Sequence, residues 1–170
     1  MSTKDRQSAS FDSSRITDID KLQIGIVVAE WNKDITDGLL SGAKQELLDS
    51  GIQENNILVH YVPGSYELPL GAQFILEYTG VAVICLGSVI RGETAHFDFV
   101  CDSCNQGIKD VGLKYNSPVM FGVLTDDNKE QSIARSGGKL GNKGNEAATA
   151  ALEMLALKQS LNKPKGKVGF

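Results

Sequence analysis

Cysteine is scarce in this chain, and a disulfide framework is excluded. There are three cysteines among 170 residues, an odd number in a chain long enough to bury a core without cross-links. Cys101 and Cys104 form a Cys-x-x-Cys pair, which can be a redox pair or half of a zinc site. The other candidate ligands, Cys85, His60 and His96, stand at spacings that do not complete a zinc site. The pair falls on the apolar face of an expected helix, so we predict that it packs in the core and that the protein holds no metal.

Long apolar runs and concentrated positive charge are lacking as well. No apolar run approaches the roughly 18 residues of a membrane span, and the N-terminal segment has no continuous apolar stretch like that of a signal peptide. The formal net charge is −4, and lysine and arginine are scattered along the chain, which argues against binding to nucleic acid or an anionic membrane. We therefore expect a soluble, cytoplasmic protein whose partners are small molecules or other proteins, with no nucleic acid and no membrane.

What the sequence does contain is a regular alternation of short apolar runs and helical patterns. The runs are rich in β-branched residues and nearly continuous, as in strands that are buried on both faces. They occupy residues 22–31, 56–63, 81–90 and 118–125. Between them, apolar residues recur at helical spacing. This order predicts an α/β fold: a single doubly wound, flavodoxin-like domain with a four-stranded parallel sheet covered by helices on both faces.

The two ends of the chain differ from this domain in composition. Residues 1–21 are polar and without a helical or strand period, so we expect a polar N-terminal arm. The α/β domain is expected at residues 22–160, followed by a flexible C-terminal tail at 161–170.

Polar and aromatic side chains follow the expected strands, at the edge of the sheet where ligands of such folds bind. The third of these loops, Arg91–His96, leads into a helix. Backbone N–H groups at the start of a helix are unpaired and lie at the positive end of its dipole, so they can bind an anion. Thr94 can hold a phosphate oxygen there, with His96 close to the group that carries it. In the simpler interpretation, Thr94 only caps the helix and His96 is a solvated residue of its first turn.

Other candidate residues have structural interpretations that remain open. The segment GGKLGNKG contains glycines typical of phosphate loops, but it lacks the Gly-Lys-Ser/Thr order and follows a helix. Arg135 ends a short helical pattern and can simply bind the last carbonyls of that helix. Trp31 and Tyr66 would each be packing residues if seen alone, although both follow expected strands.

Five ordered motifs give the chain a resemblance to a known family. They are WN, VPGSYELP, GSVIRGETAHFDFVC, FGVLT and KLGNKGNEAA. In this order and at these spacings, from about Leu22 to Leu157, they resemble lumazine synthase, the penultimate enzyme of riboflavin biosynthesis. A set of five motifs over most of the chain is far more specific than a single glycine pattern.

The resemblance implies a role for residues in each loop. Trp31 would stack on a pyrimidine, where many relatives have phenylalanine, and His96 would be the catalytic residue for proton transfer. Residues 65–67 would hold the pyrimidine and its ribityl chain, and the backbone of 88–90 would read the pyrimidine edge. The implied substrate-binding residues are Trp31, Asn32, Ser65, Tyr66, Glu67, Ser88, Val89, Ile90, Glu93, Thr94, Phe121, Arg135 and Lys143.

Some of these positions are implied to serve a neighbouring subunit or to depart from the family pattern. Phe121 and Arg135 match residues that the adjacent subunit supplies, the arginine as a phosphate partner, and Lys143 matches a lysine of the same shared site. Glu93 and Thr94 match the phosphate-binding turn. Alanine is frequent at the position of Glu93, and a carboxylate there would repel phosphate unless its side chain turned to solvent.

The resemblance also implies a reaction and an assembly. The family condenses 5-amino-6-(D-ribitylamino)uracil with 3,4-dihydroxy-2-butanone 4-phosphate, giving 6,7-dimethyl-8-ribityllumazine, water and inorganic phosphate, with no cofactor. Histidine can perform the proton transfers near neutral pH, and orientation of the two substrates supplies much of the acceleration. Members form pentamers, and a short glycine-bearing segment like GGKLGNKG accompanies pentamers that join into sixty-subunit icosahedral cages. Riboflavin synthase is a candidate protein partner.

The sequence is also compatible with other functions. A doubly wound domain of this size can bind a flavin or a phosphate without turnover, or act mainly as a shell protein. Asp126 and Asp127, at the end of an expected strand, would suit a phospho-accepting regulator, although no lysine at a following strand end completes that site.

Overall fold

A four-stranded parallel sheet lies at the centre of the molecule. The computed structural model describes residues 11–79 and 81–162. The strands run in the order β2-β1-β3-β4. Their bounds are β1 (Ile24–Ala29), β2 (Ile57–Val62), β3 (Ala82–Ile90) and β4 (Val119–Asp126). Each strand coincides closely with one of the four apolar runs, and the predicted α/β fold with a parallel sheet is confirmed.

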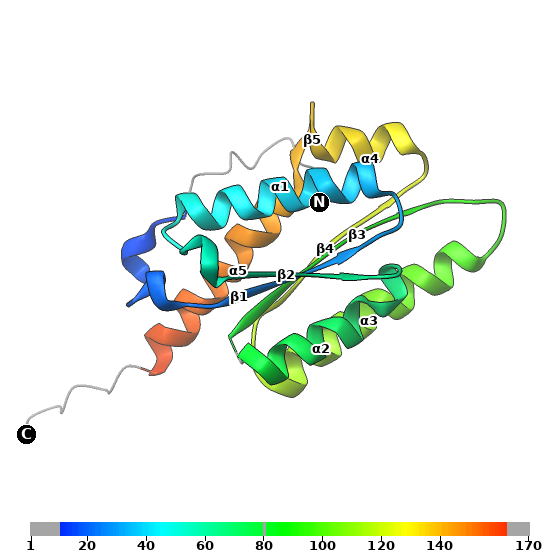
Figure 1. Cartoon of the computed structure of the whole chain (residues 1–170). Helices are drawn as coiled ribbons and strands as arrows, with labels where there is room; N and C mark the ends of the chain where they lie inside the picture. Colours follow the sequence, from blue (N-terminus) through cyan, green and yellow to red (C-terminus); the bar gives the residue numbers. More distant parts are fainter. Residues whose placement is uncertain (1–10, 80, 163–170) are drawn as a thin grey trace, which may run out of the picture.

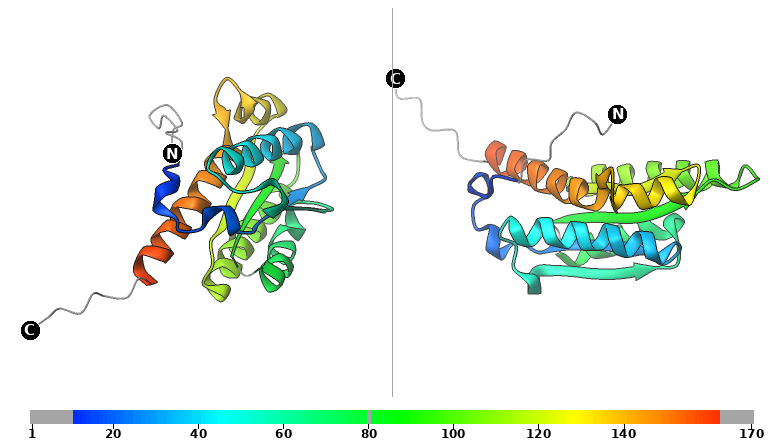
Figure 2. Two further views of the ribbon diagram at one scale, coloured as in Figure 1. Left: turned by 60° about the vertical axis from the view of Figure 1, so that its left-hand side comes forward. Right: turned by 90° about the horizontal axis from the view of Figure 1, so that it is seen from above.

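Helices cover both faces of this sheet, as predicted. They are α1 (Lys33–Asp49), α2 (Leu68–Thr79), α3 (His96–Tyr115), α4 (Lys129–Arg135) and α5 (Lys143–Asn162). α2 and α3 lie on one face and α1, α4 and α5 on the other (Figures 1 and 2). The buried side chains divide in the same way: Ile26 and Ile84 belong to the cluster under α1 and α5, whereas Val27 and Cys85 belong to the cluster under α2 and α3. This follows from the alternation of side chains along a strand.

None of the helices within residues 11–79 and 81–162 is long and apolar enough to cross a lipid bilayer.

The two inner strands are the ones buried on both faces. All six residues of β1 are buried, and so are the first seven of β3. β2 and β4 are edge strands: His60 and Tyr61 are exposed on β2, and Phe121 and Thr125 on β4. The expectation that all four runs are buried on both faces was therefore wrong for the outer two, because an edge strand has one neighbour only and its helix cover is partial.

Residues 11–21 pack against the domain that follows them, although their polarity suggests an arm. Phe11 and Ile16 are buried in the cluster under α1 and α5. The backbone N–H of Thr17 donates to the side-chain oxygen of Gln159 on α5, at 2.9 Å. Between these contacts the chain forms two short 3-10 turns, η1 (Ser13–Arg15) and η2 (Ile19–Lys21). Residues 1–10 of the expected arm lie outside the described residues.

The last helix extends into the segment where the sequence predicts a C-terminal tail. α5 continues through Asn162, so Leu161 and Asn162 are helical rather than part of a tail. Residues 163–170 lie outside the described residues.

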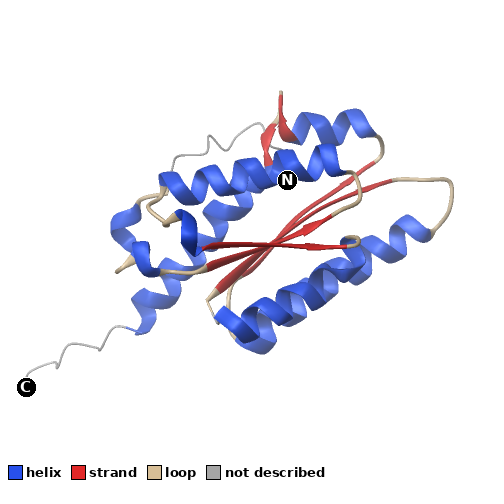
Figure 3. Cartoon of the chain, viewed as in Figure 1, coloured by secondary structure: helices blue, strands red, loops and turns tan. Residues whose placement is uncertain are grey.

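The glycine-rich segment between α4 and α5 forms a hairpin, which its sequence pattern does not predict. β5 (Ser136–Gly138) pairs antiparallel with β6 (Gly141–Asn142), and the hairpin projects beside α1 and α4 (Figure 3). Gly137 and Gly141 have φ values of 117° and 85°, in the left-handed region that glycine adopts without strain. The hairpin packs closely on α1, since a Cβ on Gly38 would overlap the carbonyl oxygen of Ser136.

Candidate active site

A cavity of about 650 Å³ opens where β1 and β3 end. All four strands end on the same side of the sheet (Figure 3). From β1 the chain moves to β2 on one side and then crosses to β3 on the other, and ligands of open α/β sheets bind at this kind of switch point. The cavity is lined by Trp31, Asn32, Gly64, Ser65, Tyr66, Glu67, Ser88, Val89, Ile90, His96 and Val100.

Asn32 joins the ends of the two central strands. It has φ 56°, which asparagine tolerates better than most residues. Its carbonyl accepts hydrogen bonds from the N–H groups of Ile35 and Thr36, at 2.9 and 3.0 Å. Its side-chain amide donates to the carbonyl oxygen of Ser88 on β3, at 2.9 Å. The side chain of Asn32 therefore fixes the backbone that forms one wall of the cavity.

The indole ring of Trp31 stands at the mouth of the cavity. The residue is 72% exposed. One edge of the ring lies beside Gly64, where a Cβ would be 3.3 Å from Trp31 Cδ1. A large aromatic ring left exposed at a cavity mouth is available to stack on a planar ligand.

The loop after β2 is drawn against β3 by a short 3-10 turn, η4 (Ser65–Glu67). Ser65 is buried, while Tyr66 is exposed. A Cβ on Gly87 of β3 would lie 2.6 Å from Ser65 Oγ, so glycine at this position lets the turn approach the strand. The side chains of residues 65–67 thereby reach the same cavity as the end of β3.

α3 begins at the cavity with His96. The residue before it, Ala95, has no polar side chain with which to cap the helix, and Thr94 Oγ1 accepts only a long hydrogen bond of 3.4 Å from the His96 N–H. The start of a 20-residue helix therefore faces an exposed turn, which leaves its dipole available to an anion. Val100 lines the same wall because residues i and i+4 share a helix face, a spacing from which its place in the cavity could have been predicted.

Arg91 anchors the turn that precedes His96, a role that the sequence analysis missed. Its guanidinium lies 4.0 Å from the centre of the Phe97 ring. Nη2 is 3.2 Å from Asp98 Oδ1, and Nε is 3.2 Å from Asp127 Oδ1. Asp98, and then Asp127, raise the pKa of Arg91. Each exposed pair is weak alone, but together they tie the turn to α3 and to the end of β4. The sequence does contain a signal for this role: a basic residue, Arg91, and an acidic one, Asp98, stand on either side of the turn.

Five of the predicted site residues do not line this cavity. Glu93 and Thr94 are exposed in the turn beside it. Arg135, at the end of α4, donates from Nη1 to the carbonyl oxygen of Gln131, at 2.9 Å, as in the simpler interpretation of a helix-end arginine. Lys143 pairs with Glu146, with Nζ 2.6 Å from Oε2.

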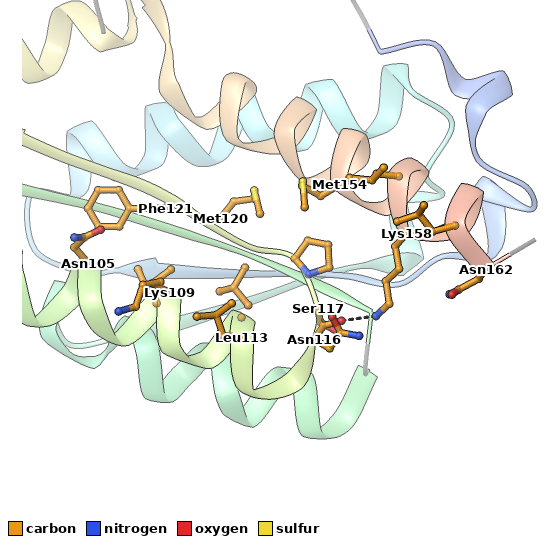
Figure 4. Close-up of a pocket in the computed structure, with 16 residues that line it drawn as sticks. Asn105, Lys109, Leu113, Asn116, Ser117, Met120, Phe121, Met154, Lys158 and Asn162 are labelled. Atoms are coloured by element: carbon orange, nitrogen blue, oxygen red, sulfur yellow. Dashed lines mark hydrogen bonds between the residues drawn. The ribbon is translucent and has the colours of Figure 1, made fainter.

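Phe121, the fifth of these residues, lies on the exposed edge strand β4. It lines a second cavity of about 600 Å³ between α3 and α5. Figure 4 shows Phe121 and Asn105 at one end of this groove and Lys158 and Asn162 towards the other. The chain therefore brings nine of the predicted residues together in one cavity and leaves Phe121 at the opposite flank of the sheet.

The Cys-x-x-Cys pair lies within α3. Burial raises the pKa of the Cys104 thiol to about 12 and also raises the pKa of Cys101, so neither is a thiolate at neutral pH, the form that redox chemistry needs. Cys104 packs in the core as predicted, while Cys101 is only partly buried. In the part of the chain that the structure describes, no group of three or more His, Cys, Asp or Glu residues could hold a metal ion.

Comparisons with known proteins identify the family of this chain. The family model of 6,7-dimethyl-8-ribityllumazine synthase matches residues 21–159. A protein of that name from Cytophaga hutchinsonii is 55% identical over 157 residues, covering 92% of this chain and 98% of the relative. One from Christiangramia forsetii is 46% identical over 168 residues, covering 98% of this chain and 100% of the relative. The match spans both central strands and every residue of the cavity, and the chain belongs to the 6,7-dimethyl-8-ribityllumazine synthase family.

Proposed function

We propose that this chain catalyses the condensation of 5-amino-6-(D-ribitylamino)uracil with 3,4-dihydroxy-2-butanone 4-phosphate to 6,7-dimethyl-8-ribityllumazine, in riboflavin biosynthesis. Water and inorganic phosphate are released. The observation that carries the proposal is the cavity at the ends of β1 and β3, in which an exposed indole, a helix start and a histidine meet.

Each part of the cavity suits one part of this reaction. Trp31 stacks on the pyrimidine, and the turn of residues 65–67 together with the fixed backbone at Ser88 holds its edge and ribityl chain. The start of α3 receives the phosphate, with Thr94 beside it. The exposed side chain of Glu93 can point to solvent while its backbone stays in the turn. Orientation of the two substrates in one cavity supplies much of the acceleration.

His96 is the catalytic residue of this proposal. The amine attacks the ketone and water is lost, and later the bond between carbon and the ester oxygen breaks and inorganic phosphate leaves, so protons must be moved between the reacting groups. His96 lies on the cavity wall beside the helix start that receives the phosphate. His96→Ala should lower kcat by about one to two orders of magnitude, at or below the low end of the usual range for loss of a general acid or base, because the substrates can exchange protons with water. An unchanged kcat would remove the assignment.

A complete site needs a second copy of the chain. Phe121 and Arg135 serve the cavity of a neighbouring subunit, since neither lines the cavity of its own chain, and Lys143 belongs to the same proposed shared site. The two surfaces that would meet are both rich in apolar side chains. On the outer face of α2, near the β2 edge, Leu70, Phe74 and Tyr78 are more than half exposed. At the β4 edge the groove of Figure 4 is lined mainly by apolar side chains.

Two different faces that fit each other generate a ring if the rotation closes. Two such faces do not fix the number of subunits. The resemblance to lumazine synthase implies five, so we propose a pentamer, its assembly into a sixty-subunit icosahedral cage, and riboflavin synthase as a candidate partner. The cytoplasm is the proposed location, in keeping with three free thiols, which persist in a reducing compartment. Native mass spectrometry and light scattering test the assembly: a stable, active monomer would refute the ring, and particles of five subunits alone would refute the cage.

Enzymatic assay tests the reaction. Purified protein mixed with both substrates should generate the absorbance and fluorescence of the lumazine, and a protein that binds the pyrimidine but forms no product would be a binding module.

Mixed oligomers test the shared site. His96→Ala and Arg135→Ala subunits, dissociated and re-assembled together, should recover part of the activity that each lacks, because some cavities then combine an intact His96 with a neighbour's intact Arg135. Re-assembled oligomers of either variant alone are the control. No recovery in verified mixed oligomers would place both residues in a single-chain site.

A further inference from the structure

The end of β4 and the helix that follows it contain a buried polar chain that leads to Arg135. Asp126, the last residue of β4, has a side chain that is 11% exposed. Ser132 on α4 is fully buried and donates from Oγ to Asp126 Oδ2, at 2.8 Å. Ser88, on the wall of the cavity, donates to Ser132 Oγ, at 3.5 Å. The other carboxylate oxygen, Asp126 Oδ1, lies 3.8 Å from Arg135 Nη1.

A carboxylate in such a position requires an explanation. Burial of a charge is costly unless the charge is paired and hydrogen-bonded. If one partner is removed, the other is left as an uncompensated buried charge. Asp126 has both kinds of partner, one on each oxygen. Its own backbone is fixed as well, because its carbonyl oxygen accepts from the Arg91 N–H at 3.0 Å and it pairs with Ile90 of β3. The carboxylate is therefore a rigid point on the sheet.

Arg135, by contrast, is a long side chain at the end of a helix of seven residues. Its contacts with Asp126 and with the carbonyl oxygen of Gln131 both use Nη1. A guanidinium has five N–H donors in a planar fork. Among residues 11–79 and 81–162, the donors of Nη2 and Nε make no hydrogen bond, so they can bind an anion. The side chain is 29% exposed, which gives an anion access to it.

From this geometry we infer that Asp126, held by Ser132, is a positioning residue that orients the guanidinium of Arg135 toward the phosphate-bearing substrate. The inference rests on the proposed role of Arg135 as phosphate partner. A side chain that is already ordered loses less conformational freedom when it binds. Asp126 also carries a negative charge, which opposes phosphate. We expect the ordering of Arg135 to outweigh the repulsion between Asp126 and phosphate. One carboxylate oxygen of Asp126 accepts from Ser132, and the other reaches only Nη1 of Arg135, at a long distance.

The test compares Asp126→Asn with the wild type in steady-state kinetics. The side-chain oxygen of the introduced asparagine can still accept from Ser132, but the charged anchor for Arg135 is lost. The KM for the phosphate-bearing substrate should rise about 2- to 10-fold, as should the inhibition constant of inorganic phosphate. The KM for the pyrimidine and kcat should change less than about twofold. Ser132→Ala should act in the same direction by a smaller factor, and it provides a second variant if Asp126→Asn folds poorly.

Three controls separate the possible causes. Asp34→Asn removes a carboxylate that pairs with Lys129 at the other end of α4, at 2.7 Å, and should leave all constants unchanged. In an Arg135→Ala background, Asp126→Asn should have no further effect on the KM for the phosphate-bearing substrate. If Arg135→Ala alone leaves that KM unchanged, the proposed role of Arg135 is wrong.

Other outcomes overturn the positioning role alone. A fall in the KM for the phosphate-bearing substrate would show that Asp126 competes with phosphate. Equal rises in both KM values, or the same effect with and without Arg135, would show that Asp126 acts only on the structure of the site.

Discussion

Replacement of Trp31 by alanine should weaken binding of the pyrimidine substrate with little loss of stability. The indole is 72% exposed, so its removal opens no core cavity, and surface substitutions of this kind change the free energy of unfolding by about 0.5 kcal/mol or less. Stacking of a base on an aromatic ring is worth about 1–3 kcal/mol by alanine substitution. At about 1.4 kcal/mol per factor of ten, the KM for the pyrimidine should rise about 5- to 140-fold.

Initial rates measured over a matrix of both substrate concentrations give the two KM values separately. The KM for the phosphate-bearing substrate should stay within about twofold, because the start of α3 that receives it is unchanged. Trp31→Phe retains a ring and should raise the KM for the pyrimidine less than about fivefold. The reasoning fails if Trp31→Ala changes that KM by less than twofold, raises both KM values equally, or lowers the melting temperature substantially.

Further predictions concern stability. Gly144→Ala should destabilise the protein by about 1–3 kcal/mol or more in urea unfolding, because the new Cβ would overlap the carbonyl oxygen of Leu39, a backbone atom. A Cβ on Gly92 would meet no atom within 4 Å in the described part of the chain, its two neighbours in sequence aside, so Gly92→Ala should leave the free energy of unfolding nearly unchanged. Equal effects of the two substitutions would contradict the packing argument. The raised pKa of Cys104, about 12, means that its neutral form contributes stability below the unfolded pKa of about 8.5, and that this contribution is lost as the pH rises from there toward 12. The free energy of unfolding should therefore fall between about pH 9 and 11 by up to about 1.4 kcal/mol per pH unit more steeply in the wild type than in Cys104→Ala, and parallel curves would contradict it.

The fold could be predicted from the sequence because each strand coincides with its own run of apolar residues. The apolar runs end where β1 and β3 end, and the loops that follow carry the side chains of the cavity. Parallel strands bring these loops to one edge whatever the loops contain. Nine of the residues that line the cavity could therefore be predicted from the positions of the strands and the motifs that follow them.

The features that were missed depend on contacts between distant segments. The burial of Phe11 and Ile16 was hidden by the polar residues around them, and the hairpin of β5 and β6 by its glycines. The exposure of β2 and β4 follows from their place in the sheet order, which apolar content does not reveal. The sequence alone is compatible with Asp126 as a phosphorylation acceptor. In the structure, however, Asp126 is buried and accepts a hydrogen bond from Ser132, unlike an acceptor that solvent can reach.

The bond between Thr17 and Gln159 has a consequence for how the protein is made. It joins positions separated by 142 residues, and α5 contributes Ala148, Ala151 and Leu152 to the same cluster as Phe11. On the ribosome, synthesis at about 5–20 residues per second releases the strands and α2 and α3 before α5 exists. One face of the nascent sheet therefore lacks its last helix until α5 is translated. Folding of that face is completed afterwards, by contacts between residues far apart in the sequence, which form slowly.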